Sequence, residues 1–121
     1  MLTFILAAAT IPTMTSIAQL RMDSVNHAWR TCVEQRAKSY RDVIPSSSSI
    51  SAQSATDAAM QSCAEFERDM RTALYSYIPE MLRGEGVKSF GASGVNMLAE
   101  ETLISVVKDI RETVESKLGA Q

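Results

Sequence analysis

Few side chains in this chain of 121 residues have the types needed for nucleophilic, acid–base or metal chemistry. Cys32 and Cys63 are its two cysteines, and His27 is its one histidine. Catalysis by a histidine base requires a nucleophile and an orienting acid beside the imidazole. Asp23 lies one helical turn before His27 and can serve as the acid, but the sequence indicates no nucleophile. We therefore expect His27 to be an ordinary helix residue and the protein not to be an enzyme.

Metal, haem and phosphate sites lack their usual residue spacings in this chain. The acidic residues that could join His27 in a metal site are Glu34, Asp57, Glu65, Glu67 and Asp69. None of them has a diagnostic spacing, and the Cys-x-x-Cys-His sequence of covalent haem attachment is absent. The stretch 84–89 contains a Lys-Ser step, but no glycine directly precedes the lysine and the stretch follows a predicted helix rather than a strand. We expect no cofactor and no metal.

The two cysteines are equidistant from a point between Ser47 and Ser48, inside a run of four serines. Both lie on apolar stripes of helical period, and residues equidistant from the turn of an antiparallel hairpin lie at the same height. The spacing therefore predicts a Cys32–Cys63 disulfide between two helices. Two free buried thiols and a redox-active pair remain alternatives, although reactive pairs usually have the Cys-x-x-Cys spacing, which is absent here.

Residues 1–18 have the layout of a secretory signal peptide. An apolar stretch from Leu2 to Ala9 is followed by Pro12, and Ser16 and Ala18 place small residues at the −3 and −1 positions of a cleavage site before Gln19. The stretch is too short to cross a bilayer, which needs roughly 20 apolar residues. We expect a periplasmic or secreted protein. If residues 2–18 are retained, they form an extra packed helix or contact a membrane partner.

The rest of the chain, residues 19–121, has the size of a single small domain. The net charge is −2 with mixed signs, so the chain lacks the clustered basic residues that nucleic acid binding requires. It also has no basic amphipathic face that would bind an anionic membrane. These absences leave another protein, or a second copy of the chain, as the expected partner.

Hydrophobic periodicity predicts three helices, at about 21–43, 51–78 and 95–118. Asp23 or Ser24 is the expected N-cap of the first helix, and Glu34 and Lys38 form an i,i+4 pair on its outer face. Pro79 is expected to end or kink the second helix near Ile78. The sequence thus predicts an all-α fold, in which a disulfide-linked antiparallel helical hairpin and a third helix form a small bundle.

The predicted connector at 83–94 holds four of the five glycines and separates the second helix from the third. We interpret it as a flexible connector. Phe90 within it is a candidate anchor for a partner protein, because a large apolar side chain on a loop can fill a partner's pocket. Trp29, on the stripe of the first helix, is the other candidate partner contact.

Short motifs over about residues 28–72 resemble small exported helical proteins of alphaproteobacteria, which carry a Trp-x-x-Cys segment and a second helix with Ala-x-x-x-Cys. The residues that carry the resemblance are Trp29 to Cys32, Arg36, Ala37, Tyr40, Ala58, Ala59, Cys63, Glu65 and Arg68. A looser likeness is to periplasmic acid-stress chaperones, which are small, helical and exported with one disulfide. The glycine-rich connector and the third helix depart from that pattern. The resemblance implies export and a disulfide-linked hairpin, and no activity.

These features together favour a non-enzymatic exported protein that binds another macromolecule, as an accessory subunit or a chaperone-like stress protein. The alternatives are a helical bundle that binds a small ligand or cofactor, and a subunit of a membrane complex that keeps its N-terminal helix.

Overall fold

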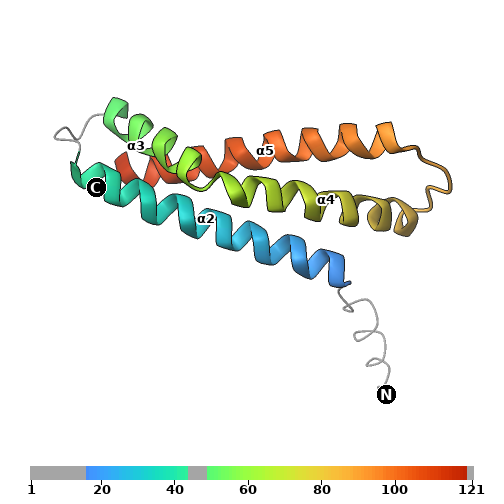
Figure 1. The fold of residues 1–121 in the computed structure, drawn as a ribbon. Coiled ribbons are helices and arrows are strands. Elements are labelled where there is room, and N and C mark those ends of the chain that lie inside the picture. The colour runs from blue at the N-terminus through green and yellow to red at the C-terminus, as the bar shows by residue number, and fades with distance from the viewer. Residues whose placement is uncertain (1–15, 44–48, 120–121) are drawn as a thin grey trace, which may run out of the picture.

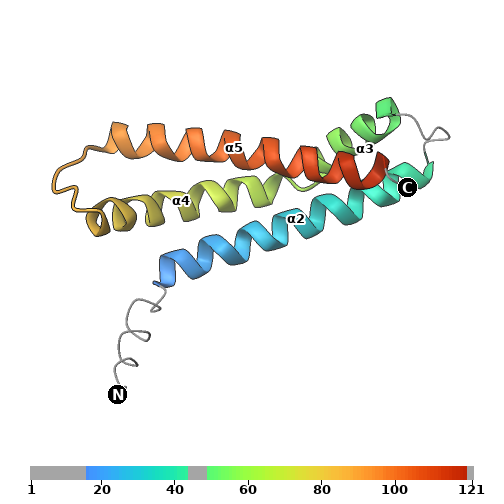
Figure 2. The same cartoon turned by 180° about the vertical axis from the view of Figure 1, so that it is seen from behind.

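The computed structural model describes residues 16–43 and 49–119, which form four helices and no strand. They are α2 (Ile17–Val43), α3 (Ser49–Ser62), α4 (Ala64–Gly84) and α5 (Ala92–Gly119). The chain runs along α2, returns through α3 and α4, and turns again into α5, so α5 runs in the same direction as α2 (Figure 1). Seen from behind, α3 lies at the end of the bundle where α2 and α5 finish (Figure 2). The predicted all-α bundle is confirmed.

A disulfide joins α2 to the return path, as the cysteine spacing predicts. Cys32 and Cys63 have an S–S distance of 2.05 Å and a Cα–Cα distance of 6.2 Å, and neither cysteine is free. That Cα separation lies within the usual range for a disulfide of roughly 4.4–6.8 Å. The bridge is possible because alanines line the neighbouring face of α3, at Ala55 and Ala59, and let the two backbones approach closely.

The prediction of one continuous helix at 51–78 is wrong at Cys63, where the chain leaves helical geometry. Cys63 has φ −104° and ψ 23°, and it stands between the last residue of α3 and the first of α4. Two main-chain hydrogen bonds are kept across the break. The Cys63 amide donates to the Ala59 carbonyl at 3.0 Å, and the Phe66 amide donates to the Cys63 carbonyl at 3.0 Å. The apolar period continues through the break, which is why the sequence concealed it.

The expectation that Pro79 ends or kinks the helix near Ile78 is also wrong about the end, because α4 runs through Pro79 to Gly84. A proline there leaves the carbonyl of Tyr75 without its helical donor, and Tyr75 lies at the surface, where water can replace it. Two residues after the helix ends, Gly86 has a φ of +88°. The Val87 amide donates to the Leu82 carbonyl at 2.9 Å and the Gly86 amide to the Arg83 carbonyl at 3.1 Å, a C-terminal capping pattern that needs a left-handed residue.

The first helix begins before the predicted N-cap at Asp23 or Ser24. It begins at Ile17, and the Ser16 hydroxyl accepts a hydrogen bond from the Gln19 amide at 3.0 Å, so Ser16 is the cap. The expected cleavage point between Ala18 and Gln19 therefore lies in the first turn of α2. The rest of the expected signal peptide, residues 1–15, lies outside the described residues.

The core draws buried side chains from all four helices. The fully buried side chains of α2 are Trp29, Val33 and Ala37, whereas Cys32 is half-buried and Arg36 is exposed. Large buried side chains come from α4 and α5. They are Met70, Leu74, Ile78, Leu103, Ile110, Val114 and Leu118. Residues on α3 contribute mainly small side chains, at Ala52, Ala55 and Ala59, together with Thr56, whose hydroxyl donates to the Ala52 carbonyl at 2.8 Å.

Candidate binding surfaces

A groove between α2 and α4 lies beside the disulfide. The groove has a volume of about 370 Å³, and its lining residues are His27, Ala28, Thr31, Cys32, Gln35, Arg36 and Phe66. Cys63 is fully buried while Cys32 is half-buried, so the groove reaches the bridge from the Cys32 side. Its lining joins one aromatic ring to several neutral polar groups and one cation. This composition suits a shallow contact surface better than a reaction centre.

A polar cluster ties α2 to the C-terminal end of α3 beside the bridge. The Arg36 guanidinium donates to the Ser62 hydroxyl at 3.0 Å. The pKa of Tyr40 is lowered from its usual value, first by its hydrogen bond with Ser62 and then by its hydrogen bond with Arg36. Arg36 is exposed on the surface of α2. The cluster holds the two helices together where the disulfide joins them.

His27 makes no hydrogen bond and no ion pair within residues 16–43 and 49–119. It is exposed, and Asp23 does not orient it. It borders a second hollow, of about 210 Å³, between α2 and α5. Two ion pairs frame that hollow, Arg30 with Asp109 at 2.6 Å and Lys117 with Glu34 at 3.1 Å. These ion pairs join α2 to α5, and none of their four side chains is hydrogen-bonded to His27.

Trp29 does not lie where a partner could reach it. Its side chain is 0% exposed in the core, so the expectation that Trp29 contacts a partner does not fit this fold. Its indole N–H has no hydrogen-bond partner, the one such buried side-chain group among the described residues. Leaving a buried donor unpaired costs about 1–3 kcal/mol, which the burial of the large ring surface offsets.

Phe90 lies in a connector that is shorter than the predicted 83–94. Because α4 continues to Gly84 and α5 begins at Ala92, the connector consists of residues 85–91. Phe90 is half-buried, and the Arg83 guanidinium carbon lies 5.4 Å from the centre of its ring. This cation–π contact places Phe90 over the end of α4, where part of the ring stays accessible. Its role in contacting a partner stays a prediction.

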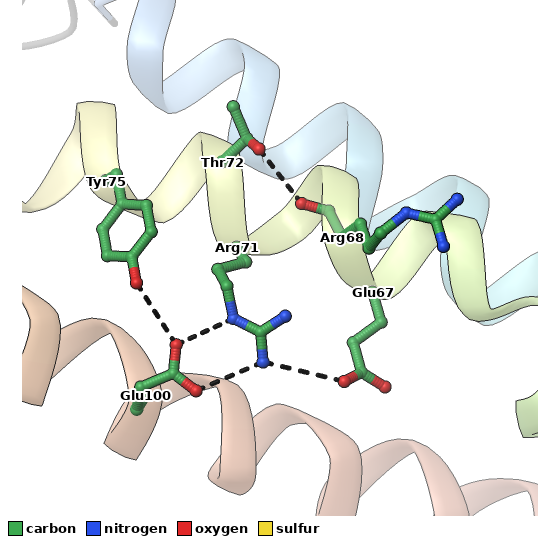
Figure 3. A network of polar contacts seen from close by, with 6 residues as sticks. All are labelled: Glu67, Arg68, Arg71, Thr72, Tyr75 and Glu100. Atoms are coloured by element: carbon green, nitrogen blue, oxygen red, sulfur yellow. Dashed lines mark hydrogen bonds and ion pairs between the residues drawn. The ribbon is translucent and has the colours of Figure 1, made fainter.

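A network of polar side chains joins α4 to α5 (Figure 3). Arg71 donates twice to Glu100, from Nε to Oε2 at 2.8 Å and from Nη2 to Oε1 at 3.2 Å. The Tyr75 hydroxyl donates to the same Oε2 at 3.4 Å, and Glu67 lies 3.8 Å from Arg71. The hydrogen bond from Arg71 is the main cause of the lowered pKa of Glu100. These contacts link α4 and α5 at one position along their axes.

α5 is joined by charged side chains to each of the other helices. Besides the pairs with α2 and α4, Arg111 pairs with Asp57 of α3 and, along α5, with Glu115 at 3.9 Å. The predicted pair between Glu34 and Lys38 is not formed, because Glu34 pairs with Lys117 of α5 instead. The outer charges of the bundle thus set how α5 lies against its neighbours.

Two large apolar side chains of α5 remain outside the core, and no helix of the described part of the chain covers them. Met97 is 60% exposed and Ile104 is 69% exposed, and their spacing of seven residues places them on one face. Sequence reasoning missed this face because it followed the buried stripe of α5. The available signal was a second set of apolar residues off that stripe, one heptad apart.

A shallow hollow of about 450 Å³ lies next to Ile104, between α3 and α5. Its lining residues are Gln53, Ile104, Val107, Lys108, Arg111, Glu112 and Glu115. Val107, one of these residues, is half-buried, and the long charged side chains beside it have aliphatic stems. Such a hollow can receive an unbranched apolar side chain from a neighbouring helix.

Within the part of the chain that the structure describes, no three acidic, histidine or cysteine side chains are grouped so that they could bind a metal ion. None of the four helices is long and apolar enough to span a membrane. Comparisons with protein-family models, curated proteins and solved structures find no match for this chain.

Proposed function

We propose that this chain is an exported, non-enzymatic helical protein that acts by binding another macromolecule, as an accessory subunit or a chaperone-like protein. The observation that carries the proposal is the uncovered apolar face of α5, where Met97 and Ile104 are both more exposed than buried. Large apolar side chains that stay together at the surface are typical of protein contact sites. The two hollows that border His27 have more polar or charged lining residues than apolar ones and so offer less to a small ligand, since pockets for such ligands are usually concave and mostly apolar.

Export is supported by the disulfide and by the N-terminal sequence. Disulfides persist in oxidising compartments and are rare where thiols are kept reduced. The Cys32–Cys63 bridge builds one directly into the core of the domain. Removal of the chain before Gln19 would take away one buried side chain of residues 16–18, that of Ala18, together with the Ser16 cap. The domain that remains keeps its core, which agrees with the resemblance to small exported proteins.

Export is tested by the intact mass of the protein isolated from its native host, with alkylation before and after reduction. We expect a mass that begins at Gln19 and no alkylation until a reductant is added. A mass that retains Met1, with two thiols that react at once, would contradict export. The readout does not depend on knowing the partner.

Binding is tested by introducing a photoreactive phenylalanine at Ile104 in the native host and identifying the cross-linked species by mass spectrometry. The matched control carries the same amino acid at Ser116, which is exposed on α5 but lies on a different face. We expect a defined cross-linked protein from position 104 and none from position 116. Equal labelling at both positions, or none at either, would argue against a binding role for this face.

A further inference from the structure

The face of α5 that holds Met97 and Ile104 also carries two charged side chains without partners. Glu101 and Lys108 are exposed, and neither makes an ion pair or a hydrogen bond within the described residues. Of the other charged side chains near this face, Glu100 pairs with Arg71 and Arg111 pairs with Asp57, whereas the exposed Glu112 has no ion pair or hydrogen bond within the described residues. The face therefore presents a free carboxylate and a free ammonium on either side of Ile104.

The order of these groups along α5 is self-complementary when the helix is reversed. Glu101 and Lys108 are equidistant from a point between Ile104 and Ser105. When two copies of α5 lie antiparallel across that point, Glu101 of each copy meets Lys108 of the other, and the two Ile104 side chains meet at the centre. In a parallel arrangement like charges would meet, which is unfavourable. An isologous contact between identical chains requires this kind of self-complementary pattern.

The same register brings Met97 to the hollow beside Ile104. Met97 and Glu112 are also equidistant from the centre, and Glu112 lines the hollow between α3 and α5. Methionine is unbranched and adapts to irregular hollows, so the exposed Met97 of one copy packs at the Glu112 end of the hollow in the other. In this arrangement the exposed Met97 and Ile104 side chains of both copies become buried at the contact.

From this arrangement we infer that the α5 face around Ile104 binds a second copy of the chain, antiparallel, with reciprocal Glu101–Lys108 ion pairs. The inference rests on the proposed function and names the partner of its binding surface. The two-fold axis passes beside Ile104, and the groove at the disulfide, which no residue of α5 lines, is left open in each copy. The assembly is a symmetric dimer of helical bundles.

The test uses sedimentation equilibrium of the oxidised protein, purified in the form that accumulates in its native host, with two charge reversals. Glu101→Lys places two cations at each contact, and Lys108→Glu places two carboxylates there. Because like charges then meet twice, we expect each variant to dimerise at least about tenfold more weakly than the wild type. Mixing the two variants restores one cation and one carboxylate at both contacts, so we expect the mixture to form heterodimers of near wild-type strength.

Ile104→Glu and Ser116→Glu complete the set. Both add a carboxylate to an exposed position of α5, but only the first lies at the inferred axis, so we expect Ile104→Glu to be monomeric and Ser116→Glu to dimerise normally. Circular dichroism confirms that each variant is folded. A monomeric wild type, or a dimer that ignores both charge reversals, would overturn the inference. If the wild type is monomeric but position 104 cross-links to a different protein, the proposed function stands and the self-association does not.

Discussion

Arg41, near the end of α2, donates a hydrogen bond of 2.7 Å to the main-chain carbonyl of Leu118, near the end of α5. The last carbonyls of a helix have no partner within the helix, and they carry the negative end of its dipole. A guanidinium from α2 thus serves as the C-terminal cap of α5. Such a contact is possible because α2 and α5 run in the same direction and finish at the same end of the bundle (Figure 2).

Loss of the disulfide should lower the free energy of unfolding by about 3–4 kcal/mol, because the bridge closes a loop with a sequence separation of 31. The variant Cys32→Ser/Cys63→Ala removes it while placing the hydroxyl only at the half-buried position. Guanidinium unfolding of the variant, the reduced protein and the oxidised protein measures the effect. The variant and the reduced protein should have the same unfolding midpoint, below that of the oxidised protein. A variant as stable as the oxidised protein would refute the expectation.

Truncation of two aromatic residues should distinguish the core from the connector. Trp29→Ala removes a fully buried ring and should cost about 3–5 kcal/mol. Phe90→Ala removes a half-buried ring whose described contact is with Arg83, and should cost about 1 kcal/mol or less. Thermal unfolding of both variants gives the comparison. Similar losses would mean that Phe90 belongs to the core, and it would no longer be a candidate partner contact.

The ion pair between Arg71 and Glu100 should make stability depend on pH in the acid range. The pKa of Glu100 is lower in the folded protein than in the unfolded chain, so its contribution is fully present above the unfolded pKa and is lost as the pH falls through the folded pKa. Glu100→Gln should be less stable than the wild type at neutral pH and equally stable below that range. Arg71→Gln removes the same pair from the other side, so the unfolding midpoints of both variants should vary less with pH in the acid range than those of the wild type. A difference in unfolding midpoint between the wild type and Glu100→Gln that stays constant at all pH values would contradict this.

Replacing Pro79 by alanine should stabilise α4. Alanine supplies the amide that the Tyr75 carbonyl lacks and removes the ring from a helix interior, an advantage partly offset by greater freedom of the unfolded chain. The expected net gain is about 1–2 kcal/mol in thermal unfolding. Glu80→Ala is the control at the next position, which is exposed, and should change stability by less than about 0.5 kcal/mol. A destabilised Pro79→Ala would show that the ring makes packing contacts worth more than the hydrogen bond.

The hairpin and its disulfide could be predicted from the sequence because both rest on local period and symmetric spacing. The break at Cys63 could not, since it leaves the apolar period intact and depends on how α3 packs on α2. Pro79 misled the prediction because helix-breaking rules assume that the freed carbonyl cannot be solvated, and here Tyr75 is at the surface. The prediction paired Glu34 with Lys38 of the same helix because a sequence shows which residues are i,i+4 neighbours. It does not show that Lys117 of α5 approaches Glu34.

The binding face was harder to predict than the fold. Trp29 attracted a functional interpretation because of its size, yet a large aromatic on an apolar stripe is a core residue by the same rule that identified the stripe. Met97 and Ile104 were missed because surface exposure is decided by which neighbours α5 has, and that is known only once the helices are placed. Their one-heptad spacing alone could not show which side of α5 stays uncovered.

The alanine face of α3 has a consequence for the motions of the domain. Each buried methyl of Ala52, Ala55 and Ala59 removes far less apolar surface from water than the large side chains of α4 and α5, so detaching α3 requires less free energy than detaching either of them. Among the amides hydrogen-bonded within the four helices, those of α3 should therefore exchange earliest. The covalent bond at Cys63 keeps the detached helix near its site, so that this opening remains a local, rapidly reversed excursion and not the first step of global unfolding.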